Sequence, residues 1–239
     1  MKETKQDRQD AGALVFCEKK VVQVAEKMAD IGREYEQLFM DLGRQMFNDI
    51  ADIEDASSAL AVIIGHIDDA VAVFNRHFPD SSPVACIKGC HFCCSFPIEC
   101  PPQVVVDVAG HLKKTVSTID LQHLISRMNR DARVRQPPLN RSACVFLNAD
   151  HLCLIYENRP LSCRWFSSPD VNICRQSLVD GRQVPQRPVI HRIFQVATTM
   201  LSAAAKHQER FHEQVGFIPS LLEVLGLPDS ETTWRGHPR

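Results

Sequence analysis

The stretch ACIKGCHFCCSFPIEC, residues 85–100, holds five of the ten cysteines of a 239-residue chain. Four of them fall between positions 86 and 94, a density that chance alone does not produce. Thiols crowded in this way form disulfides, bind a metal or take part in redox exchange. The rest of the sequence decides between these uses.

The composition predicts a protein whose thiols stay reduced. The chain is 44% hydrophobic and 23% charged, enough apolar residues for a core that needs no disulfides. The first ten positions mix charges of both signs, which argues against a secretory signal peptide. The most apolar stretch, residues 59–74, is interrupted by His66, Asp68 and Asp69, so we expect no membrane span. These features together predict a cytoplasmic protein.

The charge is uneven along the chain. The net charge is −2, with a negative excess in residues 1–80 and a positive excess in residues 81–239. Neither part is basic enough for a nucleic-acid interface, so we expect no nucleic-acid partner. The positive part contains nine of the ten cysteines. Arginine and lysine near a thiolate cluster would offset its negative charge, although ordinary surface scatter explains the charge equally well.

Residues 1–80 are predicted to form an N-terminal helical hairpin. Apolar residues at steps of three and four form one stripe along a helix over 14–54, and a second helix follows Asp55 and Ser57. The stripe packs on the rest of the chain or binds a partner, either a second copy (a homo-oligomer) or another protein. Cys17 is predicted to be a small buried hydrophobe. The stripe consists of Val24, Met28, Ile31, Tyr35, Leu38, Leu42, Met46 and Ile50.

The remaining chain completes a mainly α fold. Residues 81–188 hold most of the fourteen prolines, which predicts an irregular cysteine-rich core with short helices and one longer helix over Gln103–Arg130. Residues 189–239 resume helical spacing and are predicted to pack on this core as C-terminal helices, the last short one over Leu221–Leu225.

Eight of the cysteines have the spacing of metal ligands. The first four are separated by three, two and no residues, and the others arrive singly at intervals of eight to ten residues. Structural zinc sites usually offer two close pairs, whereas an iron–sulfur cluster accepts thiolates from separate loops. The spacing therefore favours an iron–sulfur cluster, typically 4Fe–4S, over zinc. The predicted metal ligands are Cys86, Cys90, Cys93, Cys94, Cys144, Cys153, Cys163 and Cys174.

These residues resemble the CxxCxxCC (YkgJ-like) family of zinc- or iron-chelating proteins. The resemblance covers residues 86–174 and includes the stretch IYENRPLSCRWF, residues 155–166. One departure is the first gap, which is three residues here where many members have two. Cys17 and Cys100 fall outside the pattern. The resemblance implies a metal-binding protein without an assigned reaction.

Two enzyme functions stay open as alternatives. A relative with the same kind of cluster is the flagellin lysine N-methylase, which suggests a protein lysine methyltransferase. The segment from Cys86 to Cys93 also fits C-x₃-C-x-φ-C, the signature of radical S-adenosylmethionine enzymes. Those enzymes place the motif after the first strand of a βα barrel, and this sequence predicts helices there instead. Arg159 and Arg164, next to Cys163, are the best candidates to tune a cluster, although Arg159 could equally brace the turn at Pro160.

Overall fold

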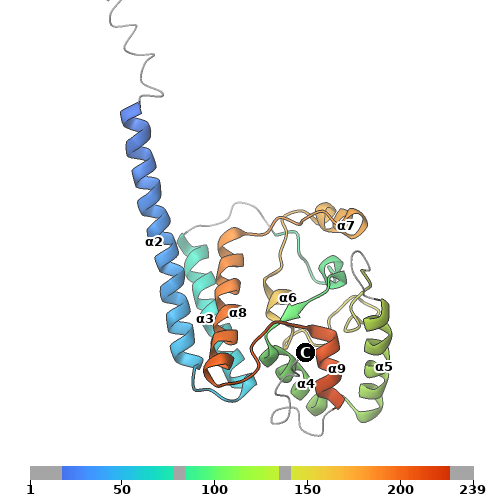
Figure 1. Cartoon of the computed structure of the whole chain (residues 1–239). Coiled ribbons are helices and arrows are strands. Elements are labelled where there is room, and N and C mark those ends of the chain that lie inside the picture. Colours follow the sequence, from blue (N-terminus) through green and yellow to red (C-terminus); the bar gives the residue numbers. More distant parts are fainter. Residues whose placement is uncertain (1–17, 78–83, 135–140, 227–239) are drawn as a thin grey trace, which may run out of the picture. The chain divides into compact units, whose positions relative to one another are not determined.

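The computed structural model describes residues 18–77, 84–134 and 141–226 (Figure 1). Within these ranges it contains eight α-helices, one 3₁₀ helix and two short strands, so the protein is mainly α, as predicted. The predicted buried position of Cys17 and the ends of the chain lie outside the described residues. The helices are α2 (Glu18–Ile50), α3 (Ala56–His77), α4 (Pro102–Thr115), α5 (Thr118–Val134), α6 (Leu161–Trp165), α7 (Val171–Asp180), α8 (Pro188–His207) and α9 (Phe217–Gly226).

The chain divides into two units, Met1–Leu42 and Gly43–Arg239, and the boundary falls inside α2. The division into segments 1–80, 81–188 and 189–239 stays a prediction. In the first unit, α2 exposes most of its apolar stripe, and the rings of Tyr35 and Phe39 meet edge to face at 4.8 Å. In the second unit, Met46 and Ile50 continue the stripe and are fully buried.

The end of α2 and the whole of α3 form the predicted hairpin. Asp49 Oδ2 lies 2.8 Å from His66 Nε2 across the two helices. Asp55 caps α3 as expected, because its carboxylate accepts a hydrogen bond of 2.7 Å from the backbone N–H of Ser58. Gly43 allows α2 to approach α8, since a Cβ at this position would lie only 3.2 Å from Val196 Cγ1.

Helix α3 has the length and mean hydropathy, 1.5 over its most apolar window, of a helix that could cross a membrane. Core helices of soluble proteins pass the same test. Leu60, Ile63 and Ile67 are buried, and α3 packs against α4 and α8. These contacts account for the buried face of α3.

The single helix predicted over Gln103–Arg130 is wrong: two helices, α4 and α5, occupy this stretch. Val116 is extended (φ −102°, ψ 136°), which ends α4. Ser117 then caps α5, because its hydroxyl accepts a hydrogen bond from the backbone N–H of Asp120 and donates one of 2.6 Å to the carboxylate of that residue. A side chain that bonds its own backbone in this way starts a new helix and stops the previous one.

The core lies where α4 and α9 pack together, with α3 and α8 on one side and α5 on the other (Figure 1). Val105, Val108, Leu201 and Leu221 are completely buried there. The strands β1 (Glu99–Cys100) and β2 (Val215–Gly216) pair antiparallel, with Cys100 opposite Val215. This pairing holds the end of the first cysteine loop against the segment that leads into α9.

Candidate metal centre

The first cysteine loop, residues 85–96, is a compact turn held at both ends. The N–H of Ala85 donates to the carbonyl of Ser168 at 2.8 Å, and the N–H of Cys90 closes a turn on the carbonyl of Ile87. Gly89 adopts φ +85°, a conformation that glycine tolerates at no steric cost. Cys93 and Cys94 follow on the 3₁₀ helix η1 (Phe92–Ser95).

The second cysteine segment begins as a tight hairpin. Leu147 and Cys153 pair as an isolated bridge, and the N–H of Leu154 donates to the carbonyl of Phe146 at 2.8 Å. The Asn148 side chain accepts hydrogen bonds from the N–H groups of Asp150 and Leu152 and so closes the turn. The hairpin brings Cys144 and Cys153, nine positions apart in the sequence, to the same end of the turn.

The two segments meet at two histidines. The His91 ring stacks on His151 with centroids 3.8 Å apart, and its Nδ1 lies 3.1 Å from the carbonyl oxygen of Gly89. A Cβ added to Gly89 would lie 3.9 Å from the carbonyl oxygen of Asp150. His91 therefore shapes the loop, as the sequence suggests, and joins the two cysteine segments.

Three thiols gather around Cys163, which lies in the first turn of α6 after Pro160. Burial, and then the nearby thiols of Cys144, Cys94 and Cys153, raise the pKa of the Cys163 thiol far above its ordinary value. Burial also raises the pKa of Cys153, and Cys94 adds to this rise. We call Cys94, Cys144, Cys153 and Cys163 the Cys163 set. Its members come from both cysteine segments.

A second group of thiols surrounds Cys90. Burial raises the pKa of the Cys90 thiol, and the neighbouring thiols of Cys86 and Cys174 raise it further. Cys174 lies on α7, which packs against η1. Asp170 starts α7 by accepting a hydrogen bond of 2.7 Å from the N–H of Asn172, and this cap positions the first turn that carries Cys174.

Backbone N–H groups point at one sulfur in each group. Phe92 donates to the Cys90 sulfur and Ile155 to the Cys153 sulfur, and both bonds lower the pKa of the thiol against the larger effect of burial. In both cases the donor is two residues after the cysteine. Such N–H donors stabilise a thiolate that is bound to a metal.

Arginines border both groups. Arg159 lowers the pKa of Cys153 and Cys163, and its guanidinium lies 4.0 Å from the ring centre of Tyr156. Its buried Nε has no hydrogen-bond partner among the described residues. Arg175 lies 5.5 Å from the ring centre of Phe92 in the first loop. Positive charge therefore surrounds the thiols, which reduces the cost of their ionisation.

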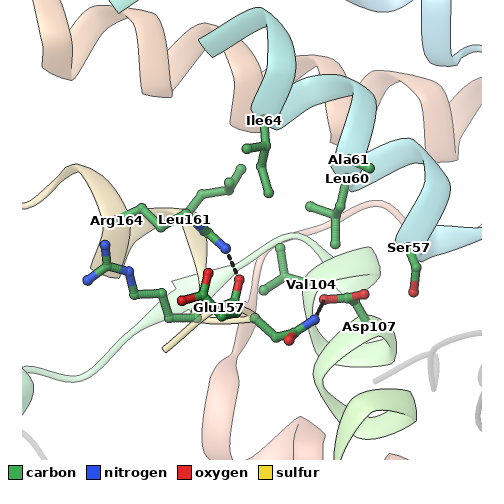
Figure 2. A pocket seen from close by; sticks show the side chains of 11 residues that line it. Ser57, Leu60, Ala61, Ile64, Val104, Asp107, Glu157, Leu161 and Arg164 are labelled. Carbon is green, nitrogen blue, oxygen red and sulfur yellow. Dashed lines mark hydrogen bonds between the residues drawn. The ribbon is translucent and has the colours of Figure 1, made fainter. Parts of the chain in front are cut away.

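A cavity of about 240 Å³ lies beside the Cys163 set, between α3, α4 and residues 157–164 (Figure 2). Arg159 and Arg164 line it together with two carboxylates, Asp107 and Glu157. Asp107 accepts a hydrogen bond of 3.2 Å from the Asn158 side chain, and Arg164 donates to the carbonyl oxygen of Glu157. Sequence reasoning missed Asp107, because it sits in the second turn of α4 with no motif around it.

Cys100 lies apart from these groups, and Cys17 lies outside the described residues. Cys100 is buried on β1 and its thiol pKa is raised by burial, consistent with its place outside the cysteine pattern. All nine described cysteines are free, and among the described residues no three His, Cys, Asp or Glu side chains are arranged to hold a single ion. Neighbouring thiols raise the pKa of Cys163 and of Cys90, so the sulfurs within each group are near enough to interact.

The family comparison agrees with this geometry. Residues 85–180 match the family CxxCxxCC, described as "Putative zinc- or iron-chelating domain". We call residues 85–180 the CxxCxxCC domain after this match. The match covers less than half of the chain and includes all eight cysteines predicted as metal ligands. No curated protein and no solved structure matches the chain. The match supports metal binding by this segment, in a family whose description names zinc or iron.

Proposed function

We propose that the CxxCxxCC domain binds metal at two sites, each made of four thiolates. The Cys163 set forms one site. The other, which we call the Cys90 set, consists of Cys86, Cys90, Cys93 and Cys174. The observation that carries the proposal is the gathering of Cys94, Cys144 and Cys153 around Cys163, which brings thiols of both cysteine segments to one place.

Cys93 belongs to the Cys90 set because the Cys163 set already has four thiols. Neighbouring residues on a 3₁₀ helix point about 120° apart, so Cys93 and Cys94 face different surroundings. The contact between η1 and α7 supports the pairing of Cys93 with Cys174. The doublet therefore connects the two sites.

Each site holds an iron–sulfur cluster of the 4Fe–4S type in this proposal. A zinc ion with bonds of about 2.3 Å draws its four sulfurs to within roughly 3.8 Å of one another. The single cysteines at intervals of eight to ten residues, which offer no close pair, favour a cluster over a zinc ion. The N–H donors of Phe92 and Ile155 and the charge of Arg159 would raise the reduction potential of such clusters.

Metal and sulfide analysis after anaerobic purification tests the proposal. Two clusters predict brown protein, an absorbance near ~400 nm, and about eight irons and about eight sulfides per chain. Colourless protein with about two zinc ions per chain would show that the two sites hold zinc and not clusters. Protein without either metal would refute the proposal.

As a metal-binding module, the protein would serve electron transfer, sensing or structure in the cytoplasm. The free cysteines fit a reducing compartment. The radical S-adenosylmethionine alternative needs an iron without a protein ligand. In the proposed Cys90 set, Cys174 takes this fourth position, and in the described residues the only strands are β1 and β2, two residues each. Both features disfavour that chemistry.

Methyl transfer is the second candidate, and the cavity in Figure 2 is the observation that favours it. Its volume of about 240 Å³ suits a side chain, and its lining carries two carboxylates, Asp107 and Glu157, balanced by Arg159 and Arg164. A lysine ammonium group would therefore have to bind on the Asp107 side, away from the two arginines. Calorimetric titration of the metal-loaded protein with S-adenosylmethionine tests the idea. The idea would be supported if S-adenosylmethionine binds and if Asp107→Asn weakens its binding in the presence of a lysine peptide but not in its absence. A titration without heat would exclude it.

A further inference from the structure

The exposed stripe on α2 repeats every seven residues. Taking Val21 as position a of a heptad, positions a and d are apolar from residue 21 to residue 38. All six side chains are exposed, with fractions from 38% for Tyr35 to 67% for Met28. The six residues are Val21, Val24, Met28, Ile31, Tyr35 and Leu38. Such a seam on one helix is the surface that coiled coils bury.

The charges beside the seam determine the orientation of a partner helix. The g positions are Lys20, Lys27, Glu34 and Asp41, two positive followed by two negative, and all four are exposed. An antiparallel copy would place Lys27 opposite Glu34 and Lys20 opposite Asp41, and symmetry repeats each pair. A parallel copy would place each g residue opposite an uncharged e residue, so no ion pair would form.

The seam residues fit the same antiparallel register. With Lys27 opposite Glu34, Met28 packs against Ile31 of the second copy, and Val24 packs against its Tyr35. The flanking e positions of these layers are Ala25 and Gly32, whose small size lets the helices approach closely. A Cβ at Gly32 would meet nothing within 4 Å in this chain, so no local contact explains glycine there.

We propose that residues 18–42 of α2 form an antiparallel coiled coil with the same segment of a second copy of this chain. The seam is about 26 Å long, from the helical rise of 1.5 Å per residue. A contact of this size is too short to be stable as an isolated peptide, so the dimer is reversible and depends on concentration. The inference does not depend on the metal proposed for the CxxCxxCC domain.

Sedimentation of the full chain between ~1 and ~100 µM tests the proposal. Wild-type protein is expected to change from monomer to dimer over this range. Lys27→Glu replaces two attractive pairs by two repulsive ones, and Glu34→Lys does the same, so each raises the dissociation constant roughly tenfold. The double variant restores both pairs with reversed signs and returns the dissociation constant to the wild-type value.

Glu26→Lys is the matched control, because position f faces away from the seam. It is expected to leave the dissociation constant unchanged, and the metal content of all four proteins should be equal. A monomer at ~100 µM would overturn the proposal and leave the stripe for a different protein. A dimer that is indifferent to both single variants, or weakened equally by Glu26→Lys, would overturn the antiparallel arrangement.

Discussion

Replacing the cysteine doublet tests how the thiols are divided. In the proposed arrangement Cys93 and Cys94 belong to different sites, so Cys93→Ala/Cys94→Ala removes one of four ligands from each. Cys144→Ala/Cys153→Ala also removes two thiols, but both from the Cys163 set. The first variant should lose nearly all bound metal, whereas the second should keep about half.

Metal content per chain, measured after passage over a chelating resin, is the assay. If each cysteine segment formed its own site, with Cys86–Cys94 apart from Cys144–Cys174, both double variants would keep about half of the metal. If all eight thiols shared one site, both would lose all of it. Either result would refute the division drawn from the contacts of Cys90 and Cys163.

A separate control tests whether each variant folds. Each variant should retain the helical circular dichroism of the wild type in its metal-loaded preparation, because α4, α8 and α9 pack without the cysteines. If the doublet variant loses this signal, single variants decide instead. Cys94→Ala and Cys174→Ala should each lose about half of the metal, and combining them should lose nearly all of it.

Three further predictions concern stability and the cavity. Gly89→Ala should lower the free energy of unfolding by about 1–2 kcal/mol, because alanine is strained at a φ of +85°. Gly110→Ala inside α4 should instead raise it by about 0.5–1 kcal/mol. Urea unfolding measures both changes, and equal midpoint shifts for the two variants would contradict this prediction. Cys100 has a raised thiol pKa in the folded state, so its unfolded form ionises first above about pH 9, and stability should fall there by up to about 1.4 kcal/mol per pH unit. Unfolding titrations of wild type and Cys100→Ala should therefore converge as the pH rises, and parallel curves would exclude this origin. Arg159→Gln should lower the reduction potential of the bound cluster in a redox titration while the iron content stays constant, and an unchanged potential would mean that Arg159 only braces its turn.

Periodicity was sufficient to predict the helices of the hairpin and of the C-terminal part. The apolar stripe of α2 and the cap at Asp55 are local features, so they can be recognised without tertiary contacts. The break between α4 and α5 was missed because the apolar spacing continues across it, and the Ser117 cap competes with the helix through one side chain. The summed helix propensity of the residues does not include a side chain that competes with the backbone for hydrogen bonds.

The candidate ligands could be predicted from spacing, but their division could not. Spacing shows that Cys90 and Cys93 can approach one centre, whereas the approach of Cys174 to Cys90 depends on the packing of α7 against η1. The cavity was equally hidden, because Asp107 and Glu157 meet through the packing of α4 against a loop fifty residues away. Contacts of this kind arise from tertiary structure alone.

The position of Cys93 beside Cys94 has a consequence for how the domain matures. Their Cα atoms are about 3.8 Å apart, joined by one planar peptide unit. Filling either site would fix the rotation of this unit and thereby orient the remaining thiol for the other site. Filling one site of the wild type should then favour filling of the other, so half-filled chains would be less frequent during reconstitution than independent loading predicts. An electron that arrives at one centre would have only a few bonds to travel to its neighbour.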